Sequence, residues 1–324
     1  MKNKILITGS SGFVGRHLVQ TLLADGQELI CPQRSHRQLA HCYCPTVGDI
    51  DGQTQWGNLF DEVHTVIHCA ARVHVMNDTA SSPIAAFRAV NVDGTLALAR
   101  QAALAGVTHF IYLSSVKVNG ESTPKGKPFD ENSPCFAEDA YGISKLEAEL
   151  ALRELSETSG MAITIIRPPL IYGAGVGANF LSMLRWVKKQ WPLPLGSIHN
   201  QRSFVFVKNL THFIARCVQN PRAYQEVFFV TDGQDLSTSE LLQTAARALG
   251  VPSRLLPFPS LLIRIAATLL GKKSIADRLC LSLQVNSAKA RSRLDWTPPY
   301  TVQEGMAETA ASLTSASAST TSPT

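Results

Sequence analysis

Long apolar runs are absent from this 324-residue chain, which argues against a membrane-spanning protein. The longest apolar stretch, residues 260–271, is interrupted by Arg264 and is far shorter than the roughly 20 residues that a transmembrane helix needs. We expect an amphipathic core helix there, with peripheral membrane contact as the alternative. No basic segment followed by an apolar one opens the sequence, so we expect no secretory signal and a cytoplasmic protein.

Concentrated positive charge and regularly spaced cysteines are also lacking. The net charge is only +5 and no run of Lys and Arg exceeds two residues, so composition does not support nucleic-acid binding. The seven cysteines are an odd number in irregular spacing, which favours reduced thiols. The cluster His41-Cys42-Tyr43-Cys44 lacks the second ligand pair of a structural zinc site, so we expect no metal.

The first half of the chain alternates short apolar runs with helical patterns. Strands are predicted at 4–8, 28–32, 65–69, 110–114 and 163–167, and helices at 14–24, 84–105 and 140–157. The strands are apolar throughout, which is typical of strands that are buried on both faces. The pattern therefore predicts an α/β fold with a doubly wound parallel sheet.

A glycine-rich turn lies between the first predicted strand and the first predicted helix. Gly9, Gly12 and Gly15 have the spacing G-x-x-G-x-x-G. In such a turn the first glycine permits the tight bend, the second lets a pyrophosphate approach, and the third allows the helix to pack on the strand. The phosphates would lie on the free N–H groups of the helix N-terminus. We therefore predict a Rossmann domain that binds a nicotinamide dinucleotide.

The end of the second strand bears on the choice between NAD and NADP. An acid at this end would bond the ribose 2′-hydroxyl of NAD, but no acid occurs between Glu28 and Asp49. Arg34 and Ser35 are suited instead to a 2′-phosphate. NADP(H) is therefore slightly favoured over NAD(H).

Beyond residue 172 the pattern changes, and prolines and glycines crowd residues 168–177 and 191–196. We expect the Rossmann domain at 1–172, with a segment at about 204–231 returning to it. Residues 173–203 and 232–309 would form a smaller C-terminal substrate-binding lobe, including a helix capped by Ser237 and Glu240. Residues 310–324 are rich in Ser, Thr and Ala without periodicity, and we expect a disordered tail there.

Candidate catalytic residues follow the fourth strand and open the helix at 140–157. Tyr141 and Lys145 are four residues apart and so share one helix face. We expect the ammonium to lower the pKa of the phenol from about 10 towards neutrality, so that the tyrosine can exchange a proton with a carbinol oxygen. Ser115, at the carboxyl end of a buried strand, could hydrogen-bond the same oxygen.

These motifs together resemble the extended short-chain dehydrogenases/reductases, in particular the nucleotide-sugar epimerase/dehydratase branch. The resemblance covers at least residues 1–300. The matching segments, in order, are 8–15, 48–50, 68–71, 91–95, 113–120, 141–145 and 167–173.

The resemblance implies a role for each matched position. Ser115, Tyr141 and Lys145 would be catalytic. The positions assigned to the cofactor, from the residues and the resemblance together, are Gly9, Ser11, Gly12, Phe13, Val14, Gly15, Arg34, Ser35, Asp49, Ile50, Ala70, Ala71, Asn91, Tyr141, Lys145 and Pro168. Those assigned to the substrate are Ser115, Tyr141, Asn179, Arg202 and Arg278, of which the last three would hold a nucleoside diphosphate.

Two departures from the family pattern narrow the chemistry. Asn119 replaces the tyrosine that the family usually has in V-Y-G, and the sequence does not indicate what this side chain contacts. The acid pair with which related dehydratases remove water is replaced by Val116 and Lys117, which argues against a dehydratase.

Two reactions remain, and Ser115, Tyr141 and Lys145 would serve both equally. One is a 4-ketoreductase, and the other is a UDP-hexose 4-epimerase with bound NAD. The sequence also resembles a bacterial subgroup linked to surface polysaccharides (O-antigen) at His74-Val75-Met76, 115–121 and 200–203. Enzymes of that subgroup reduce UDP-4-keto-6-deoxy-N-acetylhexosamine to UDP-N-acetylquinovosamine. We favour that reductase.

A dinucleotide-binding sensor without catalysis is a remote third possibility, because such proteins typically lack the Y-x-x-x-K pair. The resemblance also implies a homodimer formed through the helices at 84–105 and 140–157.

Overall fold

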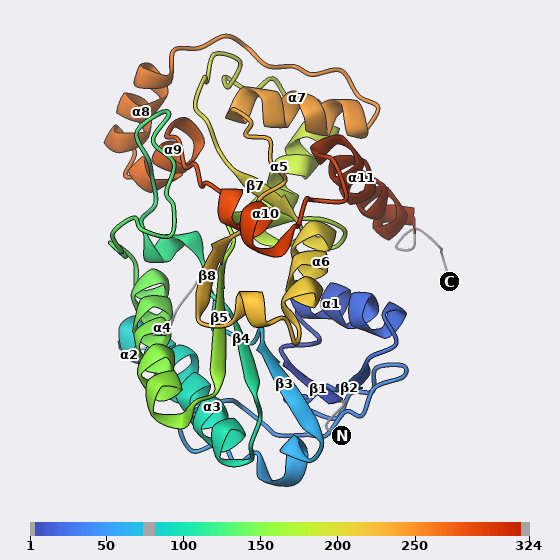
Figure 1. Cartoon of the computed structure of the whole chain (residues 1–324). Coiled ribbons are helices and arrows are strands. Elements are labelled where there is room, and N and C mark those ends of the chain that lie inside the picture. The colour runs from blue at the N-terminus through green and yellow to red at the C-terminus, as the bar shows by residue number, and fades with distance from the viewer. Residues whose placement is uncertain (1–3, 74–81, 319–324) are drawn as a thin grey trace.

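The computed structural model describes residues 4–73 and 82–318 (Figure 1). The segment His74-Val75-Met76, which contributes to the resemblance to the reductase subgroup, lies outside the described residues.

The core of the molecule is a six-stranded parallel sheet. Its strands, in the order β2-β1-β3-β4-β5-β8, are β2 (Glu28–Ile30), β1 (Lys4–Thr8), β3 (Val63–His68), β4 (His109–Leu113), β5 (Ala162–Arg167) and β8 (Glu226–Phe229). The chain winds outward from β1 to β2 and then returns to start β3 on the other side of β1. The order of strands thus reverses between β1 and β3, which is where such sheets bind ligands.

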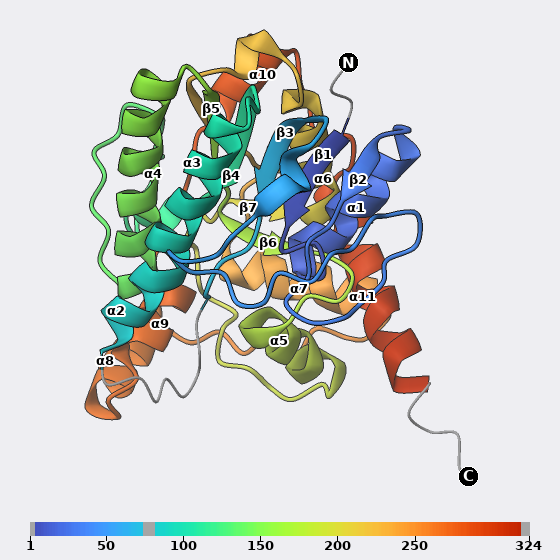
Figure 2. The ribbon, with the colours of Figure 1, turned by 90° about the horizontal axis from the view of Figure 1, so that it is seen from below.

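Helices cover both faces of the sheet (Figures 1 and 2). Ile5 and Ile7 pack with α1 (Phe13–Ala24) and α6 (Val207–Cys217), whereas Leu6 packs on the opposite face with α3 (Thr95–Leu104) and α4 (Ala140–Ser159). Before α3 the chain forms α2 (Pro83–Arg88) and a π-helical turn, η2 (Ala89–Gly94). The predicted Rossmann-like, doubly wound α/β fold is confirmed.

The C-terminal half builds a second layer beyond the carboxyl ends of the strands. Only β8 of the segment 204–231 joins the main sheet; β7 (Phe204–Phe206) pairs with β6 (Leu170–Tyr172) in a separate two-stranded sheet. The helices of this layer are α5 (Ala178–Lys188), α7 (Thr238–Ala248), α8 (Ser260–Leu269) and α9 (Lys273–Cys280), whereas α10 (Ala288–Leu294) packs with β8 in the core of the main sheet. Ser237 and Glu240 form the predicted capping box of α7.

The His41–Cys44 cluster extends the sheet beyond β2. Parallel bridges join Ile30 to Tyr43 and Gln33 to Thr46, and the Cys44 thiol donates to the carbonyl of Cys42. Within the part of the chain that the structure describes, no three His, Cys, Asp or Glu side chains are grouped to hold a metal ion.

The expectation of a core helix at 260–271 was wrong. α8 contains no buried residue, and Leu261, Leu269 and Leu270 are 64%, 82% and 73% exposed. Periodicity identified the helix, but periodicity does not tell which neighbour, if any, covers its apolar side. Among residues 4–73 and 82–318, no helix has the length and apolar character needed to cross a bilayer.

The expected disordered tail was also wrong for residues 310–318, which belong to α11 (Val302–Ala318). Met306 is fully buried and Ala310 is 2% exposed. A Cβ atom at Gly305 would lie 2.8 Å from the hydroxyl of Tyr172, so the helix packs directly against β6 and β7. The alanines that make the sequence look featureless also favour a helix once one face is packed.

This packing predicts that α11 stabilises the fold. Met306→Ala should lower the free energy of unfolding by about 2 to 5 kcal/mol, because it leaves a cavity against Tyr172 and Phe206. Gln303→Ala, at an exposed position of the same helix, is the control and should change it by less than about 0.5 kcal/mol. Both are measured by urea unfolding; equal effects of the two substitutions would contradict a packed α11.

Candidate active site

The glycine turn joins β1 to α1 at the point where the strand order reverses. Gly9 has a φ of +69°, and a Cβ atom there would lie 2.6 Å from the backbone nitrogen of Ala70. A Cβ atom at Gly15 would overlap the carbonyl oxygen of Gly9. The two glycines therefore bring β1, α1 and the end of β3 closer together than any side chain allows.

The N-terminus of α1 has the features of an anion-binding site. Gly12 is the N-cap residue; no side chain caps the helix and no acid lies in its first turn. A Cβ atom at Gly12 would meet only the carbonyl oxygen of Gly9, at 3.1 Å, so its outer side is open. Uncapped N–H groups beside an open glycine fit a dinucleotide pyrophosphate. Of the other predicted residues here, Ser11 is exposed, Phe13 is half-buried and Val14 packs in the core.

The adenine end of the predicted cofactor site contains an ion pair between two predicted residues. Arg34 Nε lies 2.7 Å from Asp49 Oδ1, and both side chains are exposed. Gln33 is buried and donates to Ser10 Oγ at 2.7 Å, whereas Ser35 is exposed. The pair leaves both side chains open to solvent, where such interactions contribute little energy.

Backbone packing fixes the edge of the site nearest β3. A Cβ atom at Gly94 would lie 2.8 Å from Ile50 Cγ2, so this glycine lets the 50–51 loop approach η2. Asn91 is 1% exposed; its Oδ1 accepts from Arg72 N at 2.8 Å and its amide donates to Ser144 Oγ at 3.0 Å. Asn91 thus joins the segment after β3 to α4. The half-buried Ala70 and Ala71 lie in that segment.

Ser115 follows β4 and caps the short helix η3 (Val116–Val118). Its Oγ accepts from Lys117 N at 3.2 Å, and the next residue, Val116, donates its N–H to Pro168 O at 3.0 Å. Pro168 directly follows β5. The serine and the proline therefore lie at the carboxyl ends of neighbouring strands, where sequence analysis expected them.

Tyr141 and Lys145 lie one turn apart on α4, but their pKa values differ from the expectation. Burial raises the pKa of Tyr141 to about 12, and the nearby carboxylate of Asp139 adds to the rise. Burial also lowers the pKa of Lys145 to about 7, and its Nζ lies 4.1 Å from the ring centre of Tyr112. A buried lysine that loses its charge near neutrality is a weak source of positive potential, so the predicted lowering of the tyrosine pKa was wrong for the chain alone.

A buried ion pair that the sequence did not reveal lies beneath these residues. Glu149, on α4, is 1% exposed and pairs with Arg167 at the end of β5. Ser114 donates to the same carboxylate. Arg167 Nη1 donates to Asn119 Oδ1 at 3.1 Å, and the Asn119 amide donates to carbonyls of residues 133 and 134. Asn119, which replaces the family tyrosine, therefore links Arg167 to the backbone of residues 133 and 134.

Lys117, in place of a dehydratase acid, belongs to a second charged cluster. Its ammonium pairs with Asp139 and lies 2.6 Å from Glu121 Oε1. Asp139 caps α4 by accepting from Gly142 N at 2.7 Å. The cluster therefore places one cation and two carboxylates near Ser115 and Tyr141.

Of the three predicted diphosphate residues, Arg202 is half-buried and Arg278 is exposed. Burial first and the charge of Arg278 second lower the pKa of Arg202 to about 10, while Glu121 opposes both. Arg202 Nη1 donates to Leu281 O at 3.0 Å, just past α9. Asn179 lies exposed in the first turn of α5, on a separate element.

The family model named "NAD dependent epimerase/dehydratase family" matches residues 5–230. A UDP-glucose 4-epimerase of Vibrio cholerae is 43% identical over 312 residues, covering 96% of this chain and 95% of that protein. An N-acetyl-α-D-glucosaminyl-diphospho-ditrans,octacis-undecaprenol 4-epimerase of Escherichia coli O157:H7 is 30% identical and covers 95% of each chain.

Solved structures share the fold at lower identity. The UDP-N-acetylglucosamine 4-epimerase of Bacillus cereus has a TM-score of 0.76 at 21% identity and covers 96% of this chain and 99% of its own. The UDP-glucuronic acid 4-epimerase of the same species has a TM-score of 0.78 at 17% identity, covering 97% and 99%. With the glycine turn, Ser115 and the Tyr141–Lys145 pair in the expected places, the family match and the close relatives show that this chain belongs to the NAD-dependent epimerase/dehydratase family.

Proposed function

We propose that this protein is a UDP-sugar 4-epimerase, which oxidises C4 of the sugar and reduces it again from the opposite face. The observation that carries the proposal is the 43% identity to a UDP-glucose 4-epimerase over almost the whole chain. The one-way 4-ketoreductase favoured by sequence analysis has no comparable support. The epimerase, then the alternative, is now the preferred hypothesis.

The proposed mechanism assigns each proton movement to this chain. Bound oxidised nicotinamide would supply the hydride acceptor. Tyr141 would exchange a proton with the C4 oxygen, and the Ser115 hydroxyl would hydrogen-bond the same atom. Lys145, held by burial on the same helix face, would position the nicotinamide ribose. Arg202 and Arg278 would hold the diphosphate while the sugar turns to present its other face.

We also propose a cytoplasmic homodimer formed through α3 and α4. Leu104 on α3 and Leu150 on α4 are 89% and 59% exposed, so each helix presents an apolar side chain that a partner could cover. All seven cysteines are free thiols, which agrees with a reducing compartment.

A lipid-linked sugar diphosphate is a second candidate substrate. The E. coli relative is named for such a substrate. The exposed apolar side chains of α8 lie next to α9, which carries Arg278. Since a UDP-sugar and a polyprenyl-diphosphate sugar share the sugar diphosphate, the same arginines could hold either.

Tyr141→Phe should lower kcat about 10²- to 10⁴-fold, because it removes the group that takes the proton of the C4 hydroxyl during oxidation and returns it during reduction. Ser115→Ala should reduce kcat less, since the tyrosine remains. The assay follows interconversion of UDP-glucose with UDP-galactose, and of the N-acetyl sugars, without added reductant. Tyr43→Phe, at an exposed site, is the control.

Turnover and dinucleotide binding that both persist in Tyr141→Phe would disprove the catalytic assignment. Oxidation of NADH or NADPH with UDP-4-keto-6-deoxy-GlcNAc, without interconversion of either sugar pair, would instead restore the ketoreductase.

Arg34 is expected to decide how the site discriminates between NADP and NAD. Arg34→Ala should weaken NADP⁺ binding about tenfold or more, because a charge-assisted contact to the 2′-phosphate is lost. NAD⁺ affinity should stay within about twofold, since a surface ion pair with Asp49 contributes little. Isothermal titration with both dinucleotides measures this, and an equal loss for both would refute the role of Arg34.

The lowered pKa of Lys145 predicts a pH-dependent effect on stability. The folded protein binds fewer protons than the unfolded chain between pH 7 and about 10.5, so this group destabilises the fold most below pH 7. Lys145→Met should therefore raise the free energy of unfolding at pH 7, and this gain should shrink as pH rises towards 10. Urea unfolding at several pH values tests it; a gain that does not vary with pH would show that Lys145 titrates normally.

A further inference from the structure

The exposed side of α8 is a continuous apolar surface at one end of the molecule. Leu261, Leu262, Ile265 and Leu269 follow helical spacing, and Leu270 and Ile275 continue the surface into α9; they are 48% to 82% exposed. We refer to these six residues as the α8 face. Large contiguous apolar surfaces on a folded chain mark places where the protein meets another apolar phase.

Positive charge surrounds the α8 face. Residues 251–280 contain five basic residues and one acid, Asp277, which gives this segment a net charge of +4 when the whole chain carries +5. Arg264 pairs with that acid, whereas Lys272 and Lys273 are exposed where α8 joins α9. A dry protein interface would have to remove these charges from water, but an anionic lipid surface would attract them.

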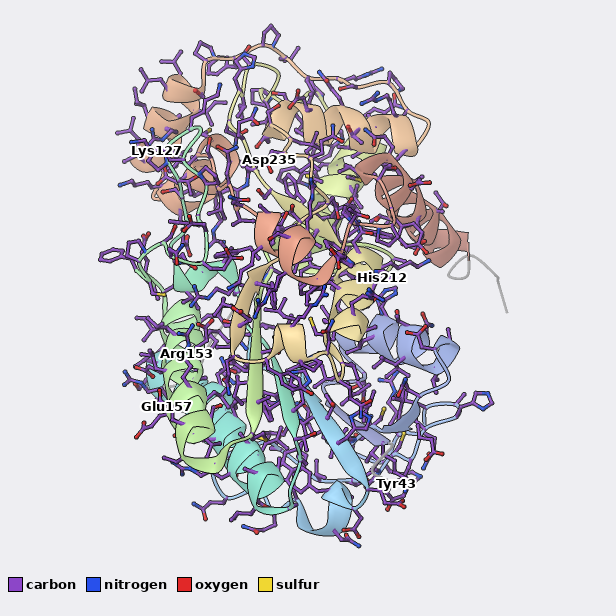
Figure 3. All side chains as sticks on the ribbon, in the orientation of Figure 1. Tyr43, Lys127, Arg153, Glu157, His212 and Asp235 are labelled. Carbon is purple, nitrogen blue, oxygen red and sulfur yellow. The ribbon has the colours of Figure 1, made fainter. Side chains whose placement is uncertain are left out.

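The loop after Ser115 adds to the same charge. Gly126 N donates to Gln284 Oε1, and Thr123 N donates to Ser282 O, so this loop is joined to the chain just after α9. Figure 3 shows Lys127 at the same end of the molecule as α8 and α9, with Tyr43 at the opposite end. Lys127 is exposed.

We propose that the α8 face docks on an anionic phospholipid bilayer, with its leucines and isoleucines in the acyl boundary and the surrounding lysines and arginines on headgroup phosphates. An apolar helix side with basic residues at its border is the pattern of a reversible interfacial helix. Docking in this way brings α9, and with it Arg278, to the membrane surface. The inference concerns the surface alone and holds whichever sugar the active site takes.

Vesicle co-sedimentation of the full chain tests the proposal. The protein should bind vesicles of equal parts phosphatidylcholine and phosphatidylglycerol, bind pure phosphatidylcholine much more weakly, and dissociate as salt is raised. Leu269→Glu should reduce binding more than about tenfold, because it removes apolar groups that the bilayer would bury and adds a charge that anionic lipids repel. The double variant Lys272→Gln/Lys273→Gln should weaken binding to the anionic vesicles only.

Tyr43→Glu is the matched control, since it makes the same kind of change at an exposed residue on the far end and should bind vesicles like the unmodified protein. All variants should keep their thermal unfolding midpoint and their activity on a soluble UDP-sugar, because none of the changed residues is buried or in the active site. Absence of vesicle binding, or equal binding by Leu269→Glu, would overturn the proposal. So would a loss of self-association in Leu269→Glu without vesicle binding, which would identify the α8 face as a contact between copies of the chain.

Discussion

The buried ion pair of Arg167 with Glu149 is the interaction on which the geometry of the site depends. Arg167 ends β5, and Glu149 lies one turn beyond Lys145 on α4. The same carboxylate accepts from Ser114, the neighbour of Ser115. Because breaking such a pair leaves an uncompensated buried charge, at a cost of about 3 to 5 kcal/mol, the helix that carries the tyrosine and lysine is held against the strand ends that carry the serine.

Tyr141 and Lys145, on the helix that this ion pair anchors, are buried, and burial shifts the pKa of each. Glu149 favours the charged form of Lys145, but burial outweighs it and the pKa falls to about 7. Tyr141 meanwhile keeps its proton, with its pKa raised to about 12. The protonated tyrosine is the form that donates to the C4 oxygen in the reduction step, whereas the oxidation step needs the deprotonated form. In this arrangement the lysine holds position on the helix face and contributes little to acidifying the phenol.

The sheet, its glycine turn and the positions of Tyr141 and Lys145 on one helix were predictable because each is a local pattern: apolar strands, glycines at fixed spacing, and two side chains four residues apart. What could not be predicted depends on neighbours distant in sequence. The exposure of α8 and the packing of Met306 on β6 and β7 have no local signature, nor does the Glu149–Arg167 pair, whose members are 18 residues apart. The expectation of a lowered pKa for Tyr141 was wrong for the same reason, since burial is a property of the whole fold.

Burial and neighbouring charges also shift a pKa at the substrate end of the site, where the charged groups are arginines. Arg202 is half-buried and Arg278 is exposed, and the pKa of Arg202 is lowered to about 10 by burial first and by the charge of Arg278 second. A partly buried cation with a like charge nearby is disfavoured, and an anion bound beside it would offset that cost. A diphosphate offsets both charges at once through charge-assisted bonds, whereas a neutral sugar offsets neither. The charges of Arg202 and Arg278 therefore agree with the proposed sugar-diphosphate substrate.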